Sequence, residues 1–393
     1  MRKREYDFWL LFTVLVLLAI GTIMVFSASS YHALYYFNNK FLFLFRQLLY
    51  GGVGIIVMFI FAKIDYRRIA VTSPVLLAVS AVLLILVIIP GVGSKLNGSA
   101  RWFDFGFVTF QPSELAKIAM ILFLGFSLSK NSDKLKYFFT GLLPYLLLIG
   151  VFDFLLYLEP HMSCIILITL VGIIIIFCAG AKIRHFVLLF VPAVIVGWQV
   201  VMSDEYRVER FLSFLNPFKY QQGSGFQVVN SLYAIASGSL FGRGLGKSLQ
   251  KYLYIPEPHN DFIFSILAEE LGFVGAVTII VLFLLFIWRG IKIAMNAPDM
   301  MGSLIAIGIT SLIAVETIIN IAVVTSSIPA TGTPLPFISA GGTSLLFIFI
   351  GVGILLNISK NNGIAYNPVR GTDKRGESVK NMRSVLDRKA GGR

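Results

Sequence analysis

Residues 251–275 read KYLYIPEPHNDFIFSILAEELGFVG. A polar segment ends here and a hydrophobic stretch begins. The junction carries Glu257, His259 and Asp261, and two further acids, Glu269 and Glu270, follow inside the apolar run. Carboxylates are costly inside a membrane segment, so they mark functional sites by default. We therefore treat this junction as the first candidate for a functional site.

The composition is typical of a protein that crosses a membrane many times. Of the 393 residues, 57% are hydrophobic and only 13% are charged, which is well below the charged share of soluble domains. A spanning helix needs about 20 mostly apolar residues. The stretches that meet this criterion are 8–28, 46–64, 73–90, 112–129, 138–158, 161–179, 185–203, 262–287, 302–324 and 342–358. The sequence thus predicts an all-α polytopic membrane protein with ten transmembrane helices, and a membrane domain over residues 1–358.

Lysine and arginine are concentrated in one alternate set of short segments. These residues are Arg2, Lys3, Arg4, Lys63, Arg67, Arg68, Lys130, Lys134, Lys136, Lys182, Arg184, Arg289 and Lys292. The short loops on the other side hold only Lys40, Arg46, Lys95 and Arg101. The positive-inside rule therefore predicts that both termini are cytoplasmic. This signal also accounts for much of the net charge of +13, so we exclude a nucleic-acid partner.

Residues 359–393 form a basic, polar C-terminal tail with few large apolar side chains. Such a composition cannot bury enough apolar surface to fold, so we expect a disordered cytoplasmic segment. A solvated tail is favoured over a tail that lies on anionic lipid.

Two segments on the outer side are too long to be simple connections. One covers residues 91–111. The other, residues 204–261, is the large extracytoplasmic loop between the seventh and eighth spans. Its middle part predicts an amphipathic helix that lies in the membrane interface or re-enters the membrane. The apolar face of that helix comprises Phe226, Val229, Tyr233, Ala236 and Leu240, and the polar face Gln227, Asn230, Ser231 and Ser237.

The fourth span opens with Gln111-Pro112-Ser113-Glu114, and Lys117 follows one turn later. Proline suits the first turn of a helix, and an acid suits its positive end. Glu114 and Lys117 also form an i,i+3 pair. An ammonium group that enters the membrane needs a further partner, so a functional role for Lys117 stays open beside the structural one. Under the functional interpretation, Lys117→Met reduces activity more than stability.

Arg101-Trp102 lies one short loop before this span and pairs a cation with an aromatic ring. The pair could bind a phosphate or a sugar face. Anchoring of the tryptophan at the membrane interface explains it equally well. Both interpretations stay open at this stage.

The segment 328–343 carries three prolines and three glycines, which preclude a regular helix. Irregular backbone at membrane depth is tolerated only where protein or a water-filled cavity satisfies it. We therefore favour a cavity wall over a plain turn, and Ser339 lies in this wall. Asp153 and Glu316 are expected to face the interior of the bundle. Asn320 follows Glu316 by one turn and could hydrogen-bond it.

Asp261 immediately precedes the eighth span. It could cap that helix, or it could act as a general base at the membrane surface. Several basic residues share its loop, namely Arg207, Arg210, Lys219, Arg243, Lys247 and Lys251. A carboxylate among cations and next to lipid suits an anionic lipid-linked substrate, because the cations hold phosphate while the carboxylate takes a proton.

These motifs resemble the SEDS family (shape, elongation, division, sporulation), which includes FtsW, RodA and SpoVE. The resemblance covers about residues 8–358. The motifs that carry it are Gly98-Ser99-Ala100-Arg101-Trp102, Gln111-Pro112-Ser113-Glu114 with Lys117, Gln227 to Val229, Gly242 to Gly246, Pro256-Glu257 with His259 and Asp261-Phe262-Ile263-Phe264, Glu269-Glu270 with Gly272, and Pro334 to Ser339. The ending from Gly353 to Ser359 is more similar to the FtsW and SpoVE branch than to RodA.

The chain departs from the family pattern at two places. Ala340 stands where the family usually has tyrosine, and Glu159-Pro160-His161 stands where it commonly has Gln-Pro-Asp. Both departures affect local contacts, and neither falls on Asp261.

The resemblance implies a peptidoglycan glycosyltransferase in the bacterial cytoplasmic membrane. Such an enzyme polymerises lipid II on the outer face into β-1,4-linked strands, inverts the anomeric centre and releases undecaprenyl pyrophosphate. It works with a class B penicillin-binding protein and with other divisome or elongasome proteins, in cell division or sporulation for this branch. A lipid II flippase or transporter and a non-catalytic scaffold of the division machinery are the alternatives.

By carry-over from the family motif, Asp261 matches the essential acid, and we expect it to be the general base. The predicted substrate-binding residues are Arg101, Trp102, Gln111, Ser113, Glu114, Lys117, Arg243, Lys247, Glu257, His259 and Ser339. Within this set, the candidate phosphate holders are Arg101, Lys117, Arg243 and Lys247. Glu257 and His259 are expected to support Asp261, whereas Glu269 and Glu270 are expected to be helix-packing or network residues. A divalent cation, Mg²⁺ or Mn²⁺, could assist, although no dedicated metal cage is visible.

Overall fold

The computed structural model describes residues 5–96, 99–106, 109–252 and 254–361. The predicted tail lies outside these residues from position 362 onward. A helix occupies every predicted span: α1 Phe8–Phe37, α2 Leu42–Lys63, α4 Ser73–Ile88, α5 Pro112–Asn131, α6 Leu143–Leu158, α7 Met162–Cys178, α8 Ile183–Met202, α11 Ile263–Met295, α12 Met300–Val324 and α13 Gly342–Lys360. Within the described residues, seven helices are long and apolar enough to cross a membrane, and α4 and α7 are shorter apolar helices. The protein is thus a multi-pass helical membrane protein.

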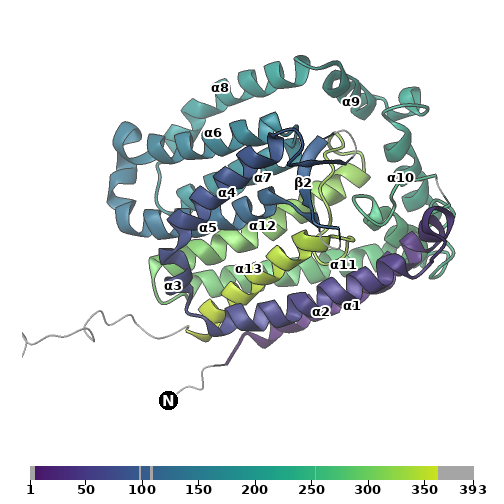
Figure 1. Ribbon diagram of the computed structural model, residues 1–393, viewed down its shortest axis with the longest axis horizontal. Helices are drawn as coiled ribbons and strands as arrows, with labels where there is room; N and C mark the ends of the chain where they lie inside the picture. Colours follow the sequence, from purple (N-terminus) through teal and green to yellow (C-terminus); the bar gives the residue numbers. More distant parts are fainter. Residues whose placement is uncertain (1–4, 97–98, 107–108, 253, 362–393) are drawn as a thin grey trace, which may run out of the picture.

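The bundle is built around α5, α12 and α13, with α1 and α2 along one edge and α8 along the opposite edge (Figure 1). α13 packs on α2, α11 on α12, and α4 on α5. Glycine allows the closest of these approaches. A Cβ atom at Gly54 would lie 2.2 Å from the ring of Phe349, and one at Gly353 would lie 2.5 Å from the carbonyl of Met58. Small residues at helix contacts are the usual means by which membrane helices come together.

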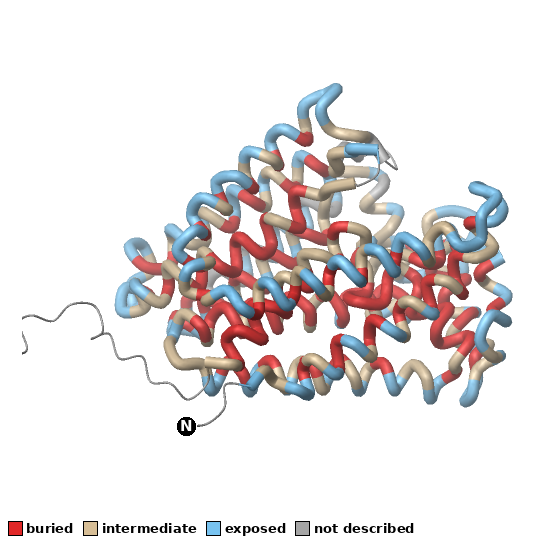
Figure 2. Tube along the Cα trace, turned by 60° about the horizontal axis from the view of Figure 1, so that its bottom comes forward, coloured by how far each residue is buried: buried red, intermediate tan, exposed pale blue. Residues whose placement is uncertain are grey.

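Buried residues gather where the helices meet, and exposed residues lie on the outer turns (Figure 2). The exposed positions include large apolar side chains such as Phe45, Leu147, Val281 and Leu284. Extended apolar surface of this kind is rare on soluble monomers. It is the surface expected of helices whose outer faces contact lipid tails.

The two ends of the described chain meet at one end of the bundle. The backbone N–H of Asp7 donates to Ser359 Oγ at 3.2 Å, and Arg289 Nε donates to the Asp7 carboxylate at 3.1 Å. At this same end, Arg67 forms an ion pair of 2.7 Å with Asp299, the N-cap of α12. The N-terminus of α1 and the C-terminus of α13 therefore lie at the same charged end of the bundle.

α11 is not the single regular span that the sequence predicts. Gly272 has φ 70° and ψ −169°, which divides the element into a short buried part, 263–271, and a long part, 273–295. The chain around Leu240 and Gly242 causes the break, because a Cβ atom at Gly272 would lie 2.3 Å from Gly242 N and 2.5 Å from Leu240 O. The long part alone, at about 1.5 Å per residue, suffices to cross the membrane. The short part supports the loop that precedes α11, through Glu269 and Glu270.

The outer segments contain structure of their own. Residues 91–111 form a small antiparallel sheet with order β1-β2-β3, from β1 Ser94–Leu96, β2 Ser99–Asp104 and β3 Thr109–Phe110. No strand was predicted for this segment, in which the aromatic residues Phe103 of β2 and Phe110 of β3 are paired. The remaining short helices are α3 Tyr66–Val71, α9 Glu205–Leu215 and α10 Phe226–Ser237.

α10 confirms a helix in the middle of the large loop, and two residues of its predicted polar face, Asn230 and Ser231, are buried. Ser231 is buried, and its hydroxyl donates to the carbonyl of Val324 at 2.7 Å. The apolar side chains of Phe226 and Tyr233 are exposed instead. Val228, Val229 and Ala234 are buried as well, so the inner side of α10 combines polar and apolar residues.

Candidate active site

Two irregular segments, 256–262 and 328–341, lie against each other beyond the ends of α11 and α12. Ala340 N donates to the carbonyl of His259 at 2.9 Å, and Ser339 Oγ donates to the carbonyl of Asn260 at 2.8 Å. Ser339 Oγ also accepts from Leu335 N at 2.8 Å. Ser339 therefore joins the two backbones. The proline-rich segment thus lies beside Asp261, and its role as a cavity wall stays a prediction.

Asn320 ties these two segments to α12. Its side-chain amide donates to the carbonyl of Asp261 and to the carbonyl of Thr333, each at 2.7 Å. The predicted hydrogen bond between Asn320 and Glu316 is wrong, because both donors of the amide are used by these carbonyls. Its Oδ1 atom has no partner among the described residues.

The Asp261 side chain is half-buried and makes no hydrogen bond or ion pair with the described part of the chain. Phe262, rather than Asp261, is the N-cap of α11, and no side chain caps that helix. This geometry argues against the capping interpretation. One carboxylate oxygen faces Gly332, where a Cβ atom would lie 3.2 Å away and where φ is +73°. Glycine at this position thus leaves space beside the carboxylate.

The charges around Asp261 make its carboxylate more basic than usual. Burial raises the pKa of Asp261 to about 6, and the neighbouring Glu257 carboxylate acts in the same direction, whereas Arg210 and Arg101 act against it. Glu257 is exposed and accepts a hydrogen bond of 2.8 Å from the Asn260 amide. A base whose pKa lies close to the working pH is the kind that general-base catalysis favours.

Two arginines bring positive charge to this carboxylate from different elements. Arg210 of α9 donates to the carbonyl of Ala330 at 3.0 Å. Arg101 of β2 donates to the carbonyl of Glu159 at 3.1 Å and to that of Pro160. The Glu159-Pro160-His161 departure is therefore the turn that holds Arg101. Arg210 was not among the predicted site residues, and the only signal for it in the sequence is the cluster of basic residues in the large loop.

The turn that holds Arg101 also buries a carboxylic acid. The Glu159 side chain is 1% exposed, and neither of its oxygens has a hydrogen-bond partner among the described residues. Burial raises the pKa of Glu159 to about 8, while the nearby Arg101 acts against this change. A neutral Glu159 at pH 7 would not offset the positive charge of Arg101.

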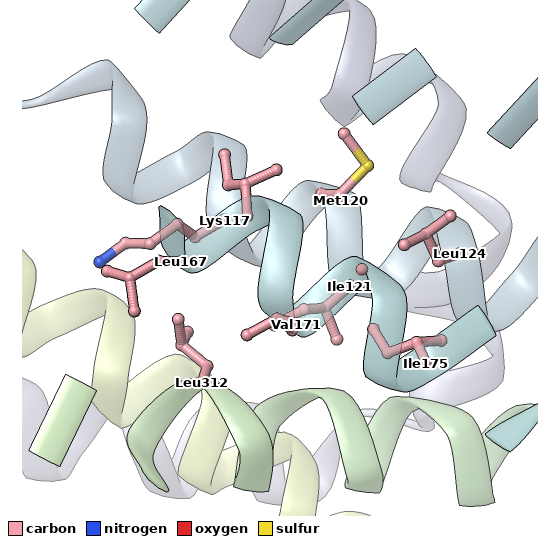
Figure 3. A pocket seen from close by; sticks show the side chains of 10 residues that line it. Lys117, Met120, Ile121, Leu124, Leu167, Val171, Ile175 and Leu312 are labelled. Carbon is pink, nitrogen blue, oxygen red and sulfur yellow. The ribbon is translucent and has the colours of Figure 1, made fainter. Parts of the chain in front are cut away.

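Lys117 lies in a buried ion cluster. Its Nζ atom is 3.0 Å from a Glu114 oxygen and 2.6 Å from a Glu316 oxygen, and all three side chains are at most 8% exposed. Figure 3 shows Lys117 at one end of a small apolar pocket between α5, α7 and α12, with its nitrogen beside Leu167 and pointing away from Met120 and Leu124. The predicted Glu114 pair is confirmed, as is the inward position of Glu316. Two carboxylates already neutralise the ammonium group, which favours the structural interpretation of Lys117.

Several other predicted substrate-binding residues have mainly structural surroundings. Gln111 is the N-cap of α5 and makes no capping hydrogen bond, and the buried Ser113 hydroxyl has no partner among the described residues. Trp102 is half-buried in β2, opposite Ser94. His259 is 2% exposed, and its ring centroid lies 4.1 Å from that of Phe43. Burial lowers the pKa of His259 to about 3, so the ring is neutral.

Glu269 and Glu270 hold the loop 243–251 by hydrogen bonds and ion pairs, which confirms the network alternative predicted for them. Glu269 accepts hydrogen bonds from Leu249 N at 2.9 Å and from Ser248 Oγ. Glu270 forms an ion pair of 3.1 Å with Lys251 and accepts a hydrogen bond of 2.7 Å from Ser27. The structure therefore explains both intramembrane acids by the loop that they support.

The predicted phosphate holders in that same loop do not join the Asp261 site. Arg243 Nε lies 3.8 Å from Glu269, and Lys247 is exposed. Glu269 lies six positions into α11, which is about 9 Å along the helix from its first residue, Ile263. No group of three or more metal-ligating side chains occurs within the described residues. The residues present thus do not form a dedicated metal cage.

Comparison with known proteins identifies the same family as the motifs. A family model described as "Cell cycle protein", FTSW_RODA_SPOVE, matches residues 8–364. The chain is 45% identical to stage V sporulation protein E of Bacillus subtilis over 91% of this chain and 98% of that protein. It is 40% identical to a probable peptidoglycan glycosyltransferase FtsW of Trichlorobacter lovleyi, over 95% of this chain and 97% of that protein.

Solved structures agree with these matches. A chain described under "Structural coordination of polymerization and crosslinking by a peptidoglycan synthase complex" has a TM-score of 0.77 and 29% identity, over 91% of this chain and 98% of that chain. The rod shape determining protein RodA of Thermus thermophilus has a TM-score of 0.67 and 27% identity, over 91% and 98%. The chain belongs to the FtsW/RodA/SpoVE family, on its FtsW and SpoVE branch.

Proposed function

We propose that this protein is a peptidoglycan glycosyltransferase that polymerises lipid II on the outer face of the cytoplasmic membrane. The single observation that carries the proposal is the Asp261 carboxylate, which faces Gly332 without a partner in the described chain and has two arginines nearby. The names of relatives at about 40% identity over most of the chain support the same activity. The branch assignment points to cell division or sporulation.

The orientation that we propose has ten spans with both termini in the cytoplasm. The charged end where Asp7 meets Ser359 and Arg67 meets Asp299 would be the cytoplasmic end, in line with the positive-inside rule. Asn320 lies about 20 residues along α12 from that end, which corresponds to about 30 Å, or the thickness of the hydrocarbon core. Because Asn320 donates to the carbonyl of Asp261, this geometry supports a position of Asp261 at the outer surface. The domain proposal is a membrane domain over 1–358 followed by a cytoplasmic tail.

In the proposed reaction, Asp261 takes the proton from the 4-hydroxyl of the acceptor sugar. That oxygen attacks the anomeric carbon of the donor, which is linked to undecaprenyl pyrophosphate. The C–O bond to pyrophosphate breaks as the new bond forms, so an α-linked donor gives a β-1,4 product. Since pyrophosphate leaves as an anion, cations can replace a general acid.

Arg101 and Arg210 are the best-placed groups to hold that pyrophosphate, because both act on the charge of Asp261. Lys117 is less suited, since two carboxylates already surround it. Arg243 and Lys247 could contact a longer substrate along the outer loop. With no protein cage for a metal among the described residues, any Mg²⁺ or Mn²⁺ requirement would enter with the substrate phosphates, and we assign no step to it.

The partner that we propose is a class B penicillin-binding protein, the transpeptidase that crosslinks the strands. A solved chain of similar fold is described as part of a peptidoglycan synthase complex that coordinates polymerization and crosslinking. Other divisome or elongasome proteins would bind to this pair.

The test uses purified protein in proteoliposomes with a matched penicillin-binding protein and labelled lipid II. Glycan polymer on a gel supports the proposal. Transfer of lipid II between leaflets without polymer would identify a flippase or transporter. Neither activity, together with retained binding to the partner, would identify a scaffold.

A further inference from the structure

We propose that Asn320 is the positioning residue that holds Asp261 in its reactive place, an inference that rests on the proposed function. Its side chain is 1% exposed. It donates one N–H to the carbonyl of Asp261 and the other to the carbonyl of Thr333, each at 2.7 Å. It thereby joins α12 to both irregular segments of the site.

The chemistry of the partners fixes how the amide is oriented. Both partners are carbonyl oxygens, which only accept hydrogen bonds, so only the NH₂ group can face them. An oxygen in that position would face two acceptors and break both contacts. The amide therefore cannot turn over, and no residue without two donors can replace it fully.

The two contacts together set the space around the carboxylate. One holds the backbone of Asp261 itself, from which the carboxylate extends by a single methylene group. The other holds Thr333, the neighbour of Gly332, and a Cβ atom at Gly332 would lie 3.2 Å from the Asp261 oxygen. A single side chain thus controls the base and the wall that faces it.

The buried ion cluster, one turn earlier on α12, fixes the position of Asn320 relative to α5. Glu316 precedes it by one turn on α12, and Lys117 of α5 pairs with Glu316 at 2.6 Å. This pair restrains α12 against α5. The buried charges then support the geometry of the site without touching the substrate.

Loss of the amide would leave two carbonyls without donors and would let the 256–262 segment relax into water. The groups that set the charge around Asp261, namely Glu257, Arg210 and Arg101, would be unchanged. Better hydration of the carboxylate would make it a weaker base. We therefore expect a slower chemical step, and an acid limb of the pH–rate profile that moves to lower pH.

The matched control is Asn357, a second buried asparagine that joins separate elements. It accepts from Tyr66 N at 3.0 Å and donates to the carbonyl of Ala62 at 2.9 Å. It lies near the end of α13, at the charged end of the bundle. Asn357→Ala therefore removes a comparable pair of hydrogen bonds far from Asp261.

The experiment compares Asn320→Ala, Asn320→Ser and Asn357→Ala in the full-length protein with its partner. It measures kcat and KM for lipid II, the pH profile and the melting temperature. Both alanine variants should have a lower melting temperature than wild type. Only Asn320→Ala should lower kcat, by roughly 10- to 100-fold with KM changed less than about twofold, because small misplacement of a catalytic group has effects of this size.

Asn320→Ser keeps one donor, so its kcat should lie between those of wild type and Asn320→Ala. It also serves as the test if the alanine variant does not fold. Equal kcat in Asn320→Ser, Asn357→Ala and wild type would overturn the inference, as would an unmoved acid limb in the Asn320 variants. A wild-type protein without polymerase activity would instead overturn the proposed function and would be recognised before any variant is compared.

Discussion

Lys117→Met isolates the role of the buried ion cluster. The substitution keeps most of the side-chain volume and removes the charge between Glu114 and Glu316, which lie 3.0 and 2.6 Å from it. Removal of one partner of a buried ion pair costs about 3–5 kcal/mol, because the remaining charge is left without compensation. At about 2 °C per kcal/mol for a large domain, the melting temperature should fall by about 6–10 °C. The geometry thus reverses the expectation from sequence that Lys117→Met affects activity more than stability.

The assay is thermal unfolding in detergent, run beside lipid II polymerisation at a temperature where the variants are folded. The triple variant Glu114→Gln, Lys117→Met, Glu316→Gln restores charge balance and should recover most of the lost stability. Lys247→Met removes an exposed lysine and should melt like wild type. A Lys117→Met protein that melts normally but no longer polymerises lipid II would refute the structural role and would identify Lys117 as a substrate-binding residue.

Three further predictions concern the surroundings of Asp261. Activity should fall as the pH drops through about 6, because a base must be ionised and the pKa of Asp261 is raised to about 6. Glu257→Gln removes a negative neighbour and should move this acid limb of the pH–rate profile to lower pH. An unmoved limb would show that Glu257 does not affect the base. Gly332→Ala should reduce kcat at least about tenfold with the protein still folded. The new methyl group would meet the Asp261 carboxylate at 3.2 Å, and φ at this position is +73°. A wild-type kcat would contradict the close approach of Gly332 to Asp261. Arg210→Ala removes the contact with Ala330 and a positive neighbour, so the acid limb should move to higher pH, and a shift in the opposite direction would exclude this arrangement.

Hydrophobicity was sufficient to predict where the helices lie. Every predicted span contains a helix, because about 20 apolar residues have no other stable arrangement in lipid. The predicted positions of the helix ends were less accurate. α1 continues to Phe37, well past the predicted end at residue 28, since helix is also stable in the interface. The break at Gly272 could not be predicted, because its cause is the packing of residues 240–242, about 30 positions earlier in the chain.

The site was predictable in its chemistry and only partly in its geometry. The Glu114 and Lys117 pair follows from local spacing, but Glu316 joins it from 199 residues away. The same limit applies to Asn320, whose partners belong to two other segments. Arg210 was recognisable only as one of several basic residues in a long loop, and the fold of α9 brings it to Ala330. Contacts between distant segments carry no periodic signal, so sequence reasoning names the residue types and leaves their partners open.

The central claim is that Asp261 is the general base of a lipid II polymerase. The most direct measurement compares the polymerisation rate of Asp261→Asn, in complex with the proposed partner transpeptidase, with that of Asp104→Asn, which changes an exposed acid of β2. Asparagine has nearly the same shape but cannot take the proton. The account predicts that the polymerisation rate of Asp261→Asn falls at least about 100-fold, which is the loss expected when general-base catalysis is removed. Its melting temperature should be unchanged. Asp104→Asn should polymerise lipid II like wild type. Normal polymer formation by folded Asp261→Asn would contradict the account.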